Sequence, residues 1–178
     1  MKICIVSDSH DNAPMLIAAV RAAKAAGAQA VLHCGDVIGS HTVRPLIKLG
    51  LPAHVVHGNN LGDPDAMHRL AAKSNGLISY HGPDAQLELA GRRVFLVHYP
   101  HYGHAMACTG EWDLICCGHS HKAEIARRPH PGGAETWLVN PGTVAGLAAP
   151  ATYALGDLAE MRFEILPVPA ITPEITQI

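Results

Sequence analysis

The chain has 178 residues, of which 48% are hydrophobic and 16% are charged, and its formal net charge is -2. This composition argues against a disordered chain, and because no basic cluster exceeds the pairs Arg92–Arg93 and Arg127–Arg128, it argues against dedicated nucleic-acid binding. No apolar run reaches membrane-spanning length and a predicted strand follows Met1-Lys2 directly, so we expect one domain over residues 1–178, in the cytoplasm and without a membrane partner.

The first predicted strand ends in two potential metal ligands. Ile3 to Val6 form an unbroken apolar run, which is typical of a strand buried on both faces of a sheet. Asp8 and His10 follow this run, and residues i and i+2 of an extended chain point to the same side. Taken alone, such a pair is more often a helix cap and a turn residue. Its meaning depends on how the other strands end.

The first half of the chain alternates strands and helices. A helix is predicted from Asn12, as the N-cap, to Ala26, with Gly27 ending it. Similar signals predict strands over 28–34 and 53–57, and helices over 40–49 and 63–73. This order is typical of an α/β domain with parallel strands.

The second half is richer in strands. They are predicted over 86–89, 93–98, 113–117, 123–127, 135–139, 152–155 and 161–166, with a hairpin turn at 129–133 and a short helix over 104–109. The stretch from Pro167 onward contains spaced prolines. We expect residues 167–178 to form a tail that lies loosely on the surface.

Five predicted strands finish in possible metal ligands. These side chains are Asp8 with His10, Asp36, Asn59, His98, and His119 with His121. Because the strand ends of an α/β sheet share one rim, five such endings are hard to explain as unrelated caps. Carboxylate, imidazole and amide groups suit Mn²⁺, Fe²⁺, Zn²⁺ or Ni²⁺. This many ligands is too many for one tetrahedral site and fits two ions that share a bridging carboxylate.

Taken in order, these motifs resemble those of the calcineurin-like metallophosphoesterases. The matching segments are Asp8-x-His10, Gly35-Asp36, Gly58-Asn59, His98 and Gly118-His119-Ser120-His121. The short length and the segments SDSHDN, HCGDV, DLICCGHSH and NPGT are most similar to the small bacterial and archaeal phosphodiesterase branch, and the resemblance covers about residues 1–166. It implies a four-layer αββα sandwich with two mixed β-sheets and a metal site at the C-terminal rim of the strands.

The resemblance also implies a division of ligands and a reaction. Asp8, His10 and His121 would bind one ion, Asn59, His98 and His119 would bind the other, and Asp36 would lie between them. Two such ions suit hydrolysis of a small phosphate ester, foremost a phosphodiester, by in-line attack of a metal-bound hydroxide. We expect two divalent ions, with manganese first and iron, zinc or nickel as alternatives.

The chain departs from the family pattern at two positions. Many members carry a histidine directly after the motif asparagine, where this chain has Asn60, which cannot act as a general acid. Tyr99 follows His98 where a glycine is common. His57 and His101 are therefore candidates to replace the missing acid, although packing is the commoner role for His57 and solvation for His101. Asn60, His57 and His101 are the candidate catalytic positions.

Two other functions stay open at this stage. One is a phosphomonoesterase or nucleotidase of the same fold. The other is a non-catalytic protein-binding scaffold, like the related retromer subunit with its eroded metal site. All the matching positions here carry competent ligands, which favours an enzyme. The sequence leaves the small substrate and a homo-oligomer undecided.

Overall fold

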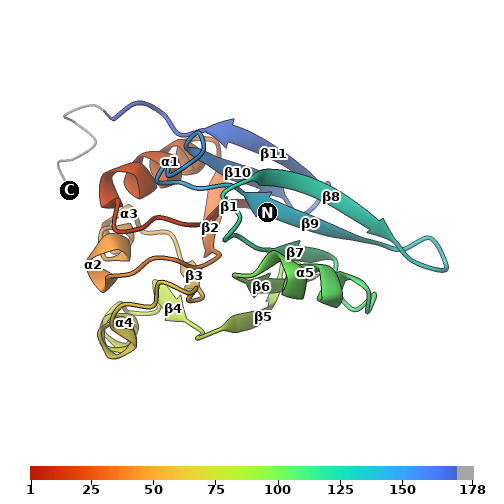
Figure 1. Cartoon of the computed structure of the whole chain (residues 1–178), viewed down its shortest axis with the longest axis horizontal. Coiled ribbons are helices and arrows are strands. Elements are labelled where there is room, and N and C mark those ends of the chain that lie inside the picture. The colour runs from red at the N-terminus through yellow and green to blue at the C-terminus, as the bar shows by residue number, and fades with distance from the viewer. Residues whose placement is uncertain (172–178) are drawn as a thin grey trace.

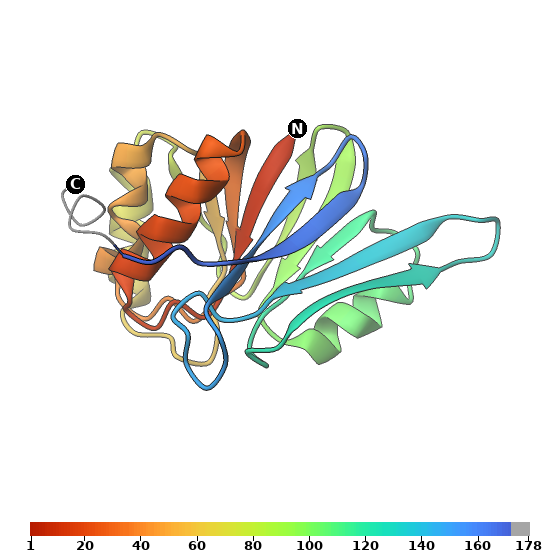
Figure 2. The ribbon, with the colours of Figure 1, turned by 90° about the horizontal axis from the view of Figure 1, so that it is seen from above.

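The computed structural model describes residues 1–171, which form two stacked β-sheets with helices on their outer faces (Figures 1 and 2). Across these residues the strands of the first sheet lie in the order β11 (Arg162–Pro167), β10 (Thr152–Asp157), β1 (Lys2–Val6), β2 (Ala28–His33), β3 (Ala53–Val55), β4 (Ile78–Tyr80). Those of the second sheet lie in the order β5 (Asp84–Leu89), β6 (Arg92–Val97), β7 (Leu114–Cys116), β9 (Glu135–Pro141), β8 (Ala123–Pro129).

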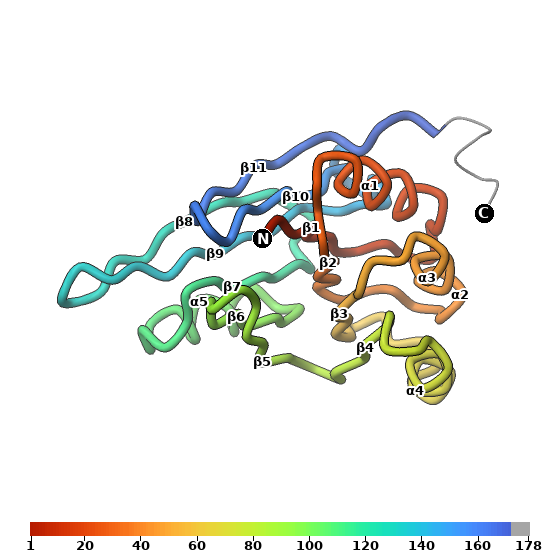
Figure 3. Tube along the Cα trace, turned by 180° about the vertical axis from the view of Figure 1, so that it is seen from behind, coloured from red at the N-terminus to blue at the C-terminus, as the bar shows by residue number. Residues whose placement is uncertain are grey.

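Both sheets are mixed. Strands β1 to β4 run parallel, while β10 and β11 continue the first sheet in antiparallel pairings. In the second sheet β6, β7 and β9 run parallel, and β5 and β8 pair antiparallel at its edges. Figure 3 shows β1 between β10 and β2, with the β8–β9 hairpin extending away from the rest of the molecule.

The helices complete a four-layer arrangement. The outer face of the first sheet is covered by α1 (Ala13–Ala25), α2 (Ser40–Val43), α3 (Leu46–Leu49) and α4 (Pro64–Ala72), and α5 (Pro100–Ala107) lies on the second sheet (Figure 2). One buried cluster packs the first helices on their sheet, a second fills the space between the sheets, and a third packs α5 on the second sheet. The predicted αββα sandwich is confirmed.

Strand β1 shows why its apolar run is unbroken. Cys4 and Val6 belong to the cluster under the helices, whereas Ile3 and Ile5 belong to the cluster between the sheets. All four side chains are fully buried. Because both faces of the strand are covered, apolar residues occupy successive positions.

Helix starts follow their predicted caps. The Asn12 side chain accepts a hydrogen bond from the Met15 amide at the start of α1, and the Asp63 side chain accepts one from the Ala66 amide at the start of α4. Each cap satisfies an amide that has no partner within its helix.

Several predicted elements need correction. The helix predicted over 40–49 is two short helices, because Pro45 between them has no N–H to donate to an unbroken ladder. The helix predicted over 104–109 begins earlier, at Pro100, and ends at Ala107. Strand β4 was not predicted.

The predicted loose tail does not begin at Pro167. That residue ends β11, and the Val168 amide donates to the Ala151 carbonyl at 3.0 Å while its side chain packs against the helix-side cluster. The rest of the predicted tail, residues 172–178, lies outside the described residues. None of the helices described in residues 1–171 has the length and apolar character needed to cross a membrane.

Packing between the sheets can be tested at Leu96, which is fully buried in the inter-sheet cluster. We expect Leu96→Ala to lower the free energy of unfolding by about 2–5 kcal/mol, because it leaves a cavity. The control Leu147→Ala removes the same atoms from a side chain that is 47% exposed. It should change the free energy by no more than about 0.5 kcal/mol. Urea unfolding of the metal-free protein, followed by circular dichroism, measures both. Equal losses in the two variants would contradict the described packing.

Candidate metal centre

The C-terminal ends of five strands from both sheets meet at one rim. Asp8 and His10 follow β1, Asp36 follows β2, and Asn59 follows β3 in the first sheet. His98 follows β6, and His119 and His121 follow β7 in the second sheet. These side chains lie close enough together to form one cluster.

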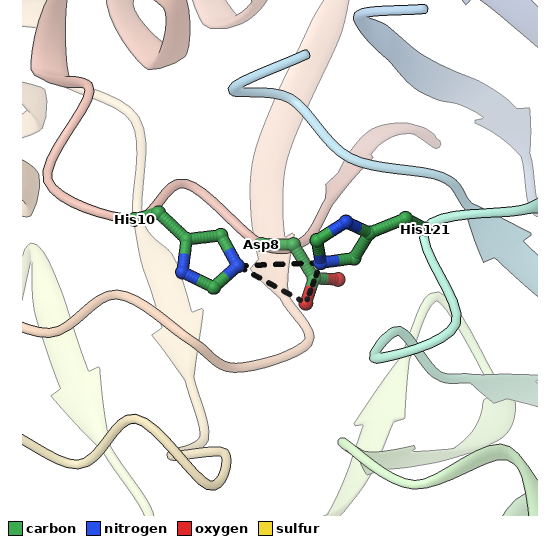
Figure 4. A group of neighbouring side chains, drawn as sticks. All are labelled: Asp8, His10 and His121. Carbon is green, nitrogen blue, oxygen red and sulfur yellow. Dashed lines mark hydrogen bonds and ion pairs between the residues drawn. The ribbon is translucent and has the colours of Figure 1, made fainter. Parts of the chain in front are cut away.

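One group of side chains contains Asp8, His10 and His121 (Figure 4). The Nε2 atom of His121 lies 3.3 Å from Oδ1 of Asp8 and 3.3 Å from Nε2 of His10. The same nitrogen of His10 is 3.8 Å from Asp8 Oδ1. Three potential ligand atoms therefore converge on one point.

A second group surrounds Asn59. Its Oδ1 atom lies 3.1 Å from Nε2 of His98 and 2.8 Å from Nδ1 of His119. Asp36 connects the two groups, since its Oδ2 is 3.7 Å from His10 Nε2 and its Oδ1 is 3.4 Å from His98 Nε2. Ligand atoms of Asp8, Asp36 and His98 also lie within 4.8 Å of one another, so the two groups adjoin.

In His98 and His121, Nδ1 donates a hydrogen bond to a backbone carbonyl, which leaves Nε2 to face the cluster. Nδ1 of His121 lies 2.8 Å from the Leu147 carbonyl, and Nδ1 of His98 lies 2.8 Å from the Cys34 carbonyl. A carbonyl only accepts, so each Nδ1 carries the proton, and in a neutral ring Nε2 carries none. Burial lowers the pKa of His98, which favours its neutral form. Its unprotonated Nε2 then faces oxygens of Asp36 and Asn59.

The Oδ1 atom of Asp8 tests whether the cluster fits a metal. It is buried and has no hydrogen-bond donor among the described residues, although Oδ2 accepts from the His119 amide at 3.0 Å. A buried polar atom left without a partner costs about 1–3 kcal/mol. Imidazole lone pairs and carboxylate oxygens that face one another repel unless a cation lies between them. The donor set therefore fits divalent cations that take nitrogen and oxygen ligands.

The backbone at the site is left-handed. Positive φ angles occur at Asp8 (54°), His10 (42°), Asp36 (53°), His119 (66°) and His121 (57°). Such conformations are uncommon outside glycine and concentrate at functional sites. The prediction that Asp8 and His10 converge because the chain is extended is therefore wrong. Their loop is shaped by hydrogen bonds from Asp8 N to Gly35 O and from His10 N to Asp36 O, both 3.0 Å long.

Two glycines make room for the acidic side chains. A Cβ atom on Gly58 would collide with Oδ1 of Asp36, and one on Gly118 would collide with Oγ of Ser7 and approach Oδ2 of Asp8 to 2.8 Å. Real Cβ contacts are not this short. Glycine is needed at both positions for the loops to approach the carboxylates closely.

The sequence predicts a loop-shaping role for Asn140 in the NPGT segment and does not single out Thr143. The Asn140 amide donates to the Gly118 carbonyl (2.8 Å) and to Ser120 Oγ (3.0 Å), which holds the loop that carries His119 and His121. Thr143 Oγ1 donates to the Asp8 carbonyl at 3.1 Å. The signal for both was the NPGT segment.

His33 supports the loop from beneath. The Gly35 amide donates to its Nδ1 at 3.3 Å, so Nε2 carries the proton and donates to Ser9 Oγ at 3.0 Å. Burial lowers the pKa of His33 to about 3, and the ring is neutral at physiological pH. This neutral ring fixes the residue between Asp8 and His10.

The candidate catalytic positions differ in their surroundings. The Asn60 backbone amide donates to Oδ1 of Asp36 at 2.9 Å, and its side-chain amide donates to Oδ2 at 2.6 Å. Burial raises the pKa of Asp36, but these two hydrogen bonds, together with the neighbouring His98 and His10, hold the pKa below its ordinary value. Asn60 is therefore placed to orient Asp36.

His57 and His101 make no described hydrogen bond to the ligand side chains. Nδ1 of His57 lies 3.0 Å from the Tyr80 hydroxyl. His101 is exposed, and its ring centroid is 4.2 Å from that of Tyr102 and 5.5 Å from that of Tyr99. The structure does not bring His101 into the cluster.

Comparison with known proteins identifies relatives of this chain. A profile of the calcineurin-like phosphoesterase superfamily domain matches residues 1–161. A phosphodiesterase of Methanocaldococcus jannaschii is 24% identical over 150 residues, which cover 82% of this chain and 86% of the relative. This chain therefore belongs to the calcineurin-like phosphoesterase superfamily, whose members use divalent metals.

Solved structures share the fold. A novel archaeal phosphodiesterase superimposes with a TM-score of 0.82 at 22% identity, covering 94% of this chain and 99% of that chain. Vps29 of Entamoeba histolytica, solved with Zn²⁺, has a TM-score of 0.61 at 15% identity and covers 95% and 100% of the two chains. Both show the two-sheet architecture.

The variant Asp8→Asn tests the fit of the cluster to cations. In metal-free protein we expect it to stabilise the fold by about 1–3 kcal/mol, because an amide N–H replaces the unpartnered oxygen and can donate to the His121 Nε2 lone pair. With Mn²⁺ present, we expect Asp8→Asn to be less stable than the unsubstituted chain, because the affinity of one site for Mn²⁺ should fall by at least about tenfold. Calorimetric titration and thermal melting with and without Mn²⁺ measure both effects.

The matched control is Asp63→Asn at the exposed N-cap of α4, where asparagine caps equally well. It should change neither metal affinity nor melting temperature. Unchanged Mn²⁺ binding in Asp8→Asn would remove Asp8 from the ligand set.

Proposed function

We propose that this member of the calcineurin-like phosphoesterase superfamily is a phosphodiesterase that binds two divalent metal ions and hydrolyses a small phosphate ester. The observation that carries the proposal is the buried Oδ1 of Asp8, which has no hydrogen-bond donor and lies 3.3 Å from His121 Nε2, the atom that carries no proton in a neutral His121 ring. The M. jannaschii relative, named as a phosphodiesterase, supports the choice of a diester.

The proposed ligand roles follow the two groups of side chains. Asp8, His10 and His121 would hold one ion, Asn59, His98 and His119 would hold the other, and Asp36 would contribute to both. We propose manganese as the native metal, with iron, zinc or nickel as alternatives that suit the same ligands. The cytoplasmic location stays a prediction from the sequence.

When bound, the two ions lower the pKa of a water molecule and stabilise the negative charge on the phosphoryl oxygens. The side chains of this chain hold that arrangement in place. Asn60 fixes both oxygens of Asp36, and Thr143 and Asn140 fix the loops that carry the other ligands. Water displaces the alcohol at phosphorus in one step, so no side chain of the protein is phosphorylated.

The leaving group receives little help from position 60. The Asn60 amide is hydrogen-bonded to Asp36 and has no proton to transfer. His57 and His101 are the remaining candidates for an acid, and water can serve where neither reaches the leaving oxygen. We therefore propose that the enzyme favours substrates whose alcohol leaves readily as an anion.

Two other functions share this fold and are outcomes of the test. A phosphomonoesterase or nucleotidase would use the same metal centre on a terminal phosphate. A protein-binding scaffold would keep the fold without turnover, and the likeness to Vps29 shows the fold alone.

Activity is tested on protein stripped with a chelator and then reloaded with Mn²⁺. We expect no turnover without metal, and at least about tenfold higher kcat/KM for bis(4-nitrophenyl) phosphate than for 4-nitrophenyl phosphate. The metal content per chain is measured on the same samples, and Asp8→Asn serves as the impaired control. A preference for the monoester would favour the monoesterase. No turnover of either ester by protein holding two ions per chain would favour the scaffold.

Leaving-group dependence tests the role of position 60. Across phosphodiesters with progressively poorer phenol leaving groups, kcat/KM of the natural chain should fall steeply. Asn60→His should make this dependence shallower, because an imidazolium can donate the proton. For the poorest leaving group we expect its kcat/KM to exceed that of the natural chain by at least about tenfold. Asn60→Ala, the control, should slow all substrates by a similar factor. The same series with His57→Ala and His101→Ala identifies an acid if either variant steepens the dependence. Identical slopes for Asn60→His and Asn60→Ala would place position 60 out of reach of the leaving oxygen.

A further inference from the structure

A cavity of about 410 Å³ lies beside β6 and α5. Most of its wall is apolar and comes from Phe95, Val97, Tyr99, Tyr102, Ala105 and Met106. Small-molecule sites typically have volumes of about 300–1,000 Å³ and mostly apolar linings. The cavity is therefore large enough for one ring system and its sugar or alkyl link.

The cavity adjoins the proposed metal centre. Tyr99 lines it and directly follows His98, and the Tyr99 ring centroid lies 5.1 Å from that of His98 and 4.9 Å from that of His119. Gly58, which precedes Asn59, lines the cavity as well. A phosphorus atom held at these ligands would have one of its ester substituents directed along Tyr99 toward the cavity.

The lining indicates what that substituent is. The rings of Tyr99 and Tyr102 are nearly perpendicular, at 85°, with centroids 5.8 Å apart, and Phe95 and Met106 add polarisable surface. Aromatic walls of this kind stack on planar rings. Neither lysine nor arginine occurs among the described residues that line the cavity, where His57 and Asp84 are the ionisable side chains besides the two tyrosines. A second phosphate is therefore disfavoured, and an uncharged ring is favoured.

We infer that this cavity binds an aromatic ring carried by one ester group of the substrate. The preferred phosphodiester then has an aryl or a nucleoside substituent, whose shared chemistry is a flat, uncharged ring. The inference rests on the proposed function, because the phosphate is taken to lie at the metal centre. It names the class of substrate that the metal ligands by themselves do not select.

Binding of phosphate monoesters to the Mn²⁺-loaded protein tests the inference with affinity, in place of turnover, as the readout, and each probe is assayed for released phosphate after the titration. The probes are methyl, phenyl and cyclohexyl phosphate and thymidine 5′-phosphate, and the dissociation constants come from calorimetry. We expect phenyl phosphate and thymidine 5′-phosphate to bind at least about tenfold more tightly than methyl phosphate. Cyclohexyl phosphate, which is similar in size but not flat, should bind more weakly than phenyl phosphate. Tighter binding of the thymidine ester than of the phenyl ester identifies a nucleoside as the substituent, and the reverse identifies an aryl group.

Two tryptophan variants on α5 locate the effect. Ala105 is exposed and lines the cavity, so Ala105→Trp fills it without disturbing a buried position. We expect this variant to bind the aromatic probes no more tightly than methyl phosphate, so that the gain of about tenfold in affinity is lost, while its affinity for methyl phosphate stays unchanged. His104 is also exposed but lines a different groove, with Arg127 and Leu138, so His104→Trp is the matched control and should keep the advantage. Thermal melting checks that both variants fold.

The outcomes separate this inference from the proposed function. Equal affinity for all probes, equal binding of cyclohexyl and phenyl phosphate, or an advantage that survives Ala105→Trp would overturn the cavity as an aromatic site. Turnover of bis(4-nitrophenyl) phosphate would leave the proposed function standing in each case. Failure of every probe to bind, together with absence of turnover, would overturn the proposed function and the inference with it.

Discussion

The unpartnered Oδ1 of Asp8 is the constraint on which the rest of the site depends. Around it, the Nε2 atoms of His121 and His98, which carry no proton in the neutral rings, face carboxylate and amide oxygens. Like partial charges repel more strongly in such a buried environment than in water. The left-handed backbone at the candidate ligands adds a further local cost. Cations bound there would offset both costs only in the folded chain, which would link metal binding to folding thermodynamically.

The packing of the two sheets holds the strained backbone of the site in place and determines which residues carry the strain. Strand β1 is packed on both faces, and the same holds for β6, whose Val94 and Leu96 face the first sheet while Phe95 and Val97 face outward. Because neither strand can shift its register without displacing these side chains, the backbone just beyond each strand is held firmly. Asp8 and His98 stand at those two points. The inter-sheet core therefore positions candidate ligands from two sheets that share no hydrogen-bond ladder.

Features set by neighbouring residues could be predicted from the sequence, whereas features set by contacts between distant residues could not. Each group of candidate ligands comes within a few residues of the end of an apolar run, so the order of the strand endings can be read from the sequence. The short strand β4 has no such run, and Pro45 divided a helix whose apolar pattern continues across it. The left-handed turn at Asp8 could not be predicted, because it depends on hydrogen bonds to Gly35 and Asp36, far along the chain. The contact of Asn60 with Asp36 is similarly non-local.

The reaction class can be inferred from local sequence motifs, whereas the substrate depends on residues that meet only in the folded molecule. The candidate metal ligands lie in short motifs that can be read directly from the sequence. The cavity is different, since Phe95, Val97 and Met106 are ordinary apolar residues of a strand and a helix that meet only in the folded molecule. Substitutions among them change the shape of the cavity while leaving the motifs intact. Membership of the superfamily therefore supports a reaction class, whereas the choice of ester group has to be read from the side chains of this chain itself.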